Sequence, residues 1–146
     1  MKPRIAIRNL HHGTLGNPLP FYNYVLGLLQ SGAVTHLFFE DVLHGGKAWY
    51  AIRKQYRFEE LGLDHIKIIL SSEELNSECD ILLSLDSQAR DFSPAVKNFK
   101  GLKVYHLMDY FWGEPLSKKV ARLQEYGVDF VLSYGSPDRY DGYFKK

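Results

Sequence analysis

The sequence predicts an α/β fold with a mostly parallel sheet, and three observations support this prediction. Short apolar runs, rich in β-branched and aromatic residues, alternate along the chain with segments of helical character, which is the pattern of βαβ units. Most of these runs are continuously apolar, as expected for strands that helices cover on both faces. Capping residues and glycines mark the starts and ends of the helical segments.

Six segments have the composition of buried strands. They are residues 4–8, 34–39, 66–70, 81–85, 104–107 and 130–133. We therefore expect a Rossmann-like three-layer sandwich with a mostly parallel sheet of about six strands.

Three helix starts carry capping signals. Ser71 is followed three residues later by Glu74, which fits a capping box, in which the glutamate also reaches back to the backbone N–H of the serine. The pairs Ser93-Pro94 and Ser136-Pro137 each place a cap residue before a proline, which has no N–H to lose in a first helical turn.

Glycines mark the predicted helix ends. Gly32, Gly101 and Gly127 each precede a predicted strand, where a glycine enters the left-handed conformation at little cost. In the helix predicted after Pro115, the apolar positions 116, 120 and 123 recur at helical spacing and should face the sheet. Its basic residues at 118, 119 and 122 should face elsewhere.

Composition limits the class of protein. The chain has 146 residues, of which 45% are hydrophobic and 24% charged, with a formal net charge of +1. This indicates one globular domain over residues 1–146, and it disfavours a nucleic-acid-binding domain, which needs clustered positive charge. Cys79 is the single cysteine. The charged segment 1–8 stands where a signal peptide needs a long apolar run, and the best apolar stretch, residues 21–29, is too short for a membrane span. We expect a cytoplasmic protein that does not span a membrane and needs no metal or cofactor.

Ligands of open parallel sheets bind beyond the carboxyl ends of the strands, so candidate site residues are sought in the loops that follow each strand. The first such loop contains His11, His12, Gly13, Gly16 and Asn17. Its backbone N–H groups could meet an anion, and either histidine could act as a general base. The dinucleotide and Walker fingerprints are missing. The alternative is that the glycines only allow the chain to turn.

A second candidate cluster follows two later strands. Asp86 and Asp109 come after consecutive predicted strands, and His106 lies three residues before Asp109. Together they could hold a substrate hydroxyl and take its proton, which makes His106 and Asp109 the candidate catalytic residues. The alternative is that both aspartates cap loops and that His106 is a core histidine.

Aromatic residues follow directly. Tyr110, Phe111 and Trp112 stand in a loop, and Tyr110 and Trp112 are candidate platforms for a sugar ring or base. The alternative is that these rings dock under the loop. No nucleophile elbow or Cys/His pair supports a covalent hydrolase.

The layout resembles the N-terminal, acceptor-side domain of bacterial glycosyltransferases of the two-domain GT-B type. The likeness is carried by residues 4–7 before the glycine-containing loop, by residues 104–109, and by residues 126–134 with the segment that ends at 143–146. The chain ends as a helix is predicted to begin, which indicates either the first domain of a longer protein or a short terminal helix; the first fits the resemblance.

The resemblance implies transfer of a sugar from a nucleotide-sugar donor to an acceptor bound mainly by this half. A C-terminal donor-binding domain of the same chain would hold most of the nucleotide. The loop from His11 to Gly16 would then face the donor phosphates, and His106 and Asp109 would lie on the acceptor side.

Two other interpretations remain open from the sequence. One is a self-contained binding or regulatory domain of flavodoxin or receiver type, although His11 and His12 stand where a receiver has paired acidic residues. The other is a complete small enzyme that works through the His/Asp cluster.

Overall fold

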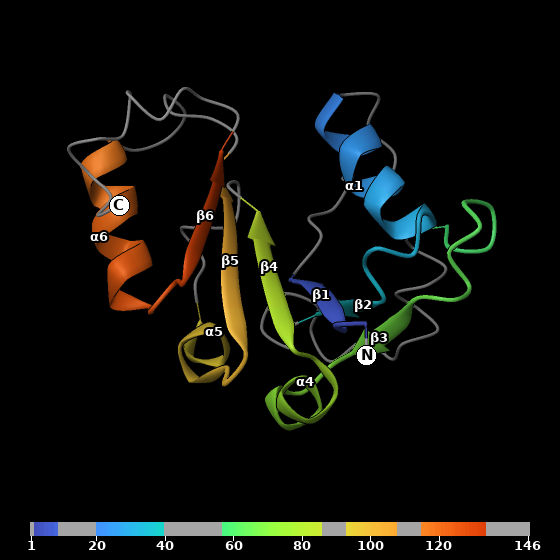
Figure 1. The fold of residues 1–146 in the computed structure, drawn as a ribbon. Coiled ribbons are helices and arrows are strands. Elements are labelled where there is room, and N and C mark those ends of the chain that lie inside the picture. Colours follow the sequence, from blue (N-terminus) through green and yellow to red (C-terminus); the bar gives the residue numbers. More distant parts are fainter. Residues whose placement is uncertain (1, 9–19, 40–56, 86–92, 108–114, 134–146) are drawn as a thin grey trace.

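The computed structural model describes residues 2–8, 20–39, 57–85, 93–107 and 115–133 (Figure 1). In this part of the chain six parallel strands form one sheet in the order β3-β2-β1-β4-β5-β6. The strands are β1 (Ile5–Arg8), β2 (His36–Phe38), β3 (Lys67–Ile69), β4 (Ile81–Leu85), β5 (Leu102–Leu107) and β6 (Phe130–Ser133). All six predicted strands are present, and the predicted α/β class is confirmed.

The strand order fixes where the chain reverses its direction across the sheet. From β1 the chain adds β2 and β3 toward one edge, and from β4 it adds β5 and β6 toward the other. The neighbouring strands β1 and β4 therefore form the topological switch point, beside which ligands bind in sheets of this kind.

Four described helices connect or flank these strands: α1 (Pro20–Gln30), α4 (Ser72–Glu78), α5 (Pro94–Asn98) and α6 (Leu116–Glu125). Figure 1 shows α1 on the side of β1–β3 and α6 beside β6. None of the described helices is both long and apolar enough to cross a membrane.

Two apolar cores lie on opposite faces of the sheet. On one face Val25 and Leu29 of α1 pack with Ile7, Leu37 and Leu83 of the central strands. On the other face, residues of α4, α5 and α6 pack against the alternate strand positions. Those helix residues are Leu75, Val96 and Leu123, and the strand positions include Ala6, Phe38, Leu82 and Tyr105. This arrangement confirms the three-layer prediction and explains the continuously apolar strands.

The predicted caps are formed where the structure describes them. The Ser71 hydroxyl accepts from the backbone N–H of Glu74 at 3.1 Å, and that of Ser93 accepts from Ala95 at 3.2 Å. The return bond of the capping box differs from the prediction, because the Glu74 carboxylate accepts from the backbone N–H of Leu70, at 3.4 Å. Ser136 and Pro137 lie outside the described residues.

Two of the three predicted glycine positions have the expected backbone. Gly32 and Gly127 have φ values of 69° and 66°. Gly101 is different, because φ is not positive there and the constraint is space. A Cβ at this position would overlap the backbone oxygen of Asp80 and approach the Phe99 ring to 2.6 Å. The same Asp80 oxygen accepts from the Leu102 N–H, which holds the two segments together.

The helix after Pro115 shows one departure from the prediction. Val120 and Leu123 of α6 are buried as expected, and Lys118 is exposed. Lys119, however, is only 4% exposed, although it was expected to face away from the core. Its long methylene stem allows a lysine next to a buried position to cover apolar surface.

Candidate functional site

The carboxyl ends of β1, β4 and β5 lie at one edge of the sheet, where the sequence placed the candidate site. Among the predicted site residues, His106 is in the described part of the chain. The others lie outside the described residues: His11, His12, Gly13, Gly16, Asn17, Asp86, Asp109, Tyr110 and Trp112. Their predicted roles stay predictions.

His106 is the second-last residue of β5 and is almost fully buried, with 3% of its surface exposed. In the sheet register it lies between Leu85 of β4 and Leu132 of β6. Its ring packs against Tyr24 of α1 at a centroid distance of 5.1 Å and an interplanar angle of 52°. The imidazole therefore lies on the α1 face of the sheet, close to the carboxyl edge.

The opposite face carries a polar row that the sequence analysis did not single out. Arg8 is the last residue of β1 and has no exposed surface, and Ser84 and Tyr105 are also buried. The register pairs Ile7 with Leu83, which brings Arg8 level with Ser84, and Ser84 pairs with Tyr105. These three residues share a face with Ala6 and Leu82, because side chains alternate along a strand.

A sequence signal for Arg8 was present. In a strand whose other residues are apolar, an arginine at an inward position breaks the pattern that burial demands.

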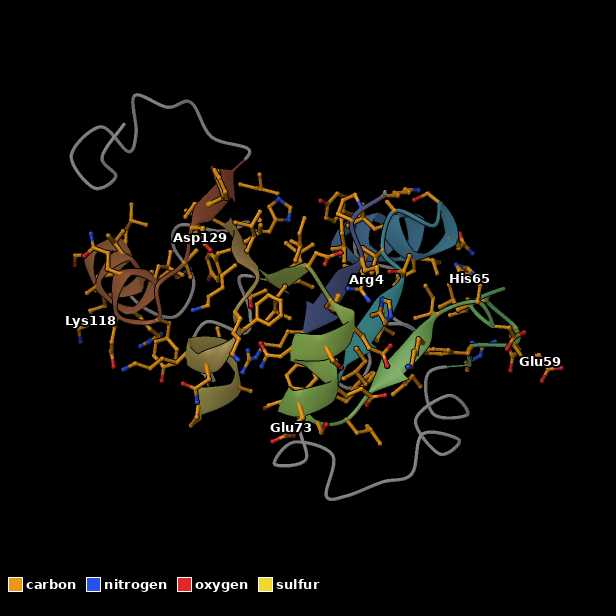
Figure 2. The ribbon with its side chains drawn as sticks, turned by 60° about the horizontal axis from the view of Figure 1, so that its bottom comes forward. Arg4, Glu59, His65, Glu73, Lys118 and Asp129 are labelled. Atoms are coloured by element: carbon orange, nitrogen blue, oxygen red, sulfur yellow. The ribbon has the colours of Figure 1, made fainter. Side chains whose placement is uncertain are left out.

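The opposite, amino edge of the sheet carries a charged network. Arg4 binds the Asp80 carboxylate through its backbone N–H at 2.8 Å and its guanidinium at 3.2 Å. Lys67 pairs with Glu74 and Glu78. Figure 2 shows Arg4 near the middle of the molecule, away from Glu59 and Lys118 at its periphery.

Ionisation at the amino edge follows these contacts. Hydrogen bonds from Lys67 lower the pKa of Glu78, and those from Arg4 lower the pKa of Asp80. Each pair is solvent-exposed on at least one side, so each adds little to stability. Because the network lies away from the carboxyl ends, we interpret it as structural.

Cys79 is not suited to act as a nucleophile at neutral pH. It is buried beside the amino edge, and desolvation raises the pKa of its thiol to about 11. A thiol with so high a pKa stays protonated and is a poor nucleophile. Among the described residues there is also no group of three histidine, cysteine or acidic side chains that could hold a metal ion.

Comparison with known proteins leaves the function open. No protein-family model and no curated protein matches the chain. A solved structure with a similar fold is phenylacrylic acid decarboxylase from Aquifex aeolicus, which is 12% identical. The match covers 99% of this chain and 87% of that chain, with a TM-score of 0.47. A likeness of this strength supports no functional assignment for this protein.

Proposed function

We propose that this chain is the acceptor-binding half of a glycosyltransferase that moves a sugar from a nucleotide-sugar donor to an acceptor. The observation that carries the proposal is the strand order β3-β2-β1-β4-β5-β6 with all neighbouring strands parallel. Such a sheet gathers the ends of its central strands into one ligand-binding edge.

The resemblance adds to this argument because its three segments belong to elements of the same sheet. Residues 4–7 contribute to β1, residues 104–107 to β5, and residues 126–133 lead into and form β6. In the proposed enzyme a second domain would hold the nucleotide, and the edge described above would face it.

Polar groups from this half would then bind the acceptor and take the proton from its hydroxyl. His106 would serve as a proton acceptor for an acceptor hydroxyl, with Asp109 as its charged partner. A histidine is suited to this role because it titrates near neutral pH. His106 is buried against Tyr24, so the hydroxyl would have to reach the ring from the carboxyl edge.

The alternative of a flavodoxin-type or receiver-type domain gains no specific support. Those folds order five strands as 2-1-3-4-5, with the switch point between the first and third strands. Here the described residues form six strands, and β1 adjoins β4.

The proposal is tested by sequencing the gene beyond codon 146 and assaying its complete product. We expect a second α/β domain and release of nucleotide from a nucleotide-sugar when an acceptor is present. We also expect residues 1–146 alone to show no turnover. A stop codon directly after Lys146, or robust sugar transfer by residues 1–146 alone, would overturn the proposal.

A further inference from the structure

We propose that residues 137–146 form an amphipathic helix whose aromatic face packs on an exposed apolar strip of β5 and β6. The strip consists of Leu102, Phe130 and Leu132. This inference stands apart from the proposed transferase role. It rests on the exposure of the strip, on the helix that covers the other face of β6, and on the sequence that follows β6.

The strip gathers exposed apolar side chains on one face of the sheet. Among the described residues, the large apolar side chains that are exposed are Leu102, Phe130 and Leu132, with 47%, 56% and 47% of their surface accessible. Phe130 pairs with Val104 and Leu132 with His106. Leu102 shares their face, because it stands two positions before Val104 on β5. Single exposed apolar residues are ordinary, but three neighbours on one face indicate a surface that packs against something.

The strip lies on the α1 face of the sheet, where the described helices leave it uncovered. Val104 packs against the core under α1, which places the strip on that face. The helix α1 itself lies on the side of β1–β3 (Figure 1). On the opposite face Val131 packs against the core that contains Leu123 of α6. One face of β6 is therefore occupied by α6, and the other is available.

The segment that follows β6 has the sequence pattern of a short amphipathic helix. It lies outside the described residues, and its pattern comes from the sequence. After the predicted helix start at Pro137, the aromatic residues Tyr140, Tyr143 and Phe144 recur at the spacing of one helix face. The opposite face is polar and carries Asp138, Asp141 and Lys145. So short a helix is marginal in water and needs an apolar surface for its aromatic face.

Position and size favour this segment over a second copy of the chain as the occupant of the strip. β6 ends at Ser133, so residues 134–136 connect it to the predicted helix, which is an ordinary length for such a connection. A large aromatic side chain can bury about 150–250 Å². Three half-exposed side chains therefore offer a few hundred Å², whereas each partner in a stable interface buries about 800 Å². One short helix is enough to cover the strip.

The first test looks for the contact in the parent chain by NMR. Nuclear Overhauser effects are measured between the ring protons of the segment and the methyl groups of Leu102 and Leu132, whose signals are assigned by their loss in the alanine variants. We expect effects from at least one ring of the segment to these methyl groups. We expect none to the methyl groups of Leu61, which packs against the core under α1.

A double-substitution cycle tests the same contact by stability. Leu132→Ala and Phe144→Ala should each lower the equilibrium constant of folding, measured by urea unfolding. Their combined effect should differ from the product of the two single effects by at least about 2-fold, the lower end for residues in contact. The matched control combines Phe144→Ala with Leu61→Ala, whose effects should multiply.

Three outcomes would overturn the proposal. The first is the absence of any Overhauser effect between the segment and the strip, and the second is a Leu132/Phe144 cycle whose effects multiply. The third is a dimer in sedimentation that Leu132→Ala dissociates and Phe144→Ala does not, which would show that a second copy covers the strip. The first is observed in the parent chain, so the test does not depend on whether the variants fold. None of these outcomes bears on sugar transfer.

Discussion

His106 and Arg8 lie near the same edge of the sheet but on opposite faces, and alternation along the strands is the cause. His106 shares the α1 face with Leu83 and Leu85, whereas Arg8 shares the other face with Ala6. A ligand that contacts both must pass over the carboxyl edge itself. His106 can therefore be tested independently of Arg8.

The first prediction concerns His106 in the complete enzyme. Removing a general base usually lowers the rate by about 100- to 10,000-fold. We expect His106→Gln to lower kcat within this range. Because His106 is buried against Tyr24, the variant should also lose stability, by about 1–3 kcal/mol for a disturbed buried polar group.

The measurement is kcat on the natively folded fraction, with urea unfolding of the same variant. Tyr24→Leu is the matched control, since it disturbs the same packing without removing the imidazole. Equal losses of kcat in both variants would show that His106 contributes through packing and not as a general base.

The second prediction concerns His36, at the amino edge. Burial lowers the pKa of His36. The nearby Glu78 carboxylate raises this pKa, but by less than burial lowers it, and the positive charges of Lys67 and Arg4 lower it further. The unfolded chain therefore takes up a proton at His36 at a higher pH than the folded chain does. The stability that neutral His36 contributes is complete above the ordinary histidine pKa of about 6.5 and is lost as the pH falls through the lower folded value.

Urea midpoints between pH 7.5 and 5 measure this effect. The parent chain should lose stability as the pH falls, and His36→Gln should lose less. Further loss should come in both chains as the pH falls below about 4.5 and through the lowered pKa values of Glu78 and Asp80, where these carboxylates take up protons and leave their partners. Identical slopes of the two chains between pH 7.5 and 5 would contradict the prediction.

At the scale of elements, two glycines should respond to alanine in opposite directions. Gly27 lies inside α1, is exposed, and has open space where a Cβ would stand. Gly101 begins the approach to β5, where a Cβ would overlap the Asp80 backbone oxygen. Gly27 therefore only lowers the helix propensity of α1, whereas Gly101 is required because a larger residue would not fit.

We expect Gly27→Ala to raise the free energy of unfolding by about 0.5–1 kcal/mol. Gly101→Ala should lower it by about 1–3 kcal/mol, because the obstacle is backbone that the β4–β5 pairing holds in place. Thermal or urea unfolding of the two variants measures both. A neutral Gly101→Ala would mean that the Asp80 segment can shift freely.

At the scale of the whole molecule, the two cores share one sheet. Ile7 faces one core and its neighbour Ala6 faces the other, so neither core can be lost without exposing the strands that support the second. We therefore expect residues 1–146 to unfold in one cooperative transition, as small single domains usually do.

Leu29→Ala in the α1 core and Leu75→Ala in the α4 core test this expectation. Both leucines are fully buried, and each substitution should lower the free energy of unfolding by about 2–5 kcal/mol. Each variant should still unfold in a single step seen equally by far-UV circular dichroism and by intrinsic protein fluorescence. A split transition in either variant would show that the cores are independent.

The sequence determined the fold class and the strands. Apolar runs of strand length and capping residues such as Ser71 and Ser93 are local signals, and burial on both faces turns such runs into parallel strands. Which side chains pack on each face of the sheet depends on contacts between residues far apart in the sequence. Lys119 is buried in spite of its charge, and Gly101 is required by a carbonyl 21 positions earlier in the chain rather than by its own backbone angles.

The candidate site divides in the same way. The rule that ligands bind at carboxyl ends needs only strand ends and strand direction, so the sequence alone leads to this candidate edge and to His106, whose role stays a prediction. The tertiary structure alone decided that Arg8, Ser84 and Tyr105 form one buried row and that His106 faces the other way. Register and strand order bring residues 76 and 21 positions apart into line, and no local pattern in the sequence encodes that alignment.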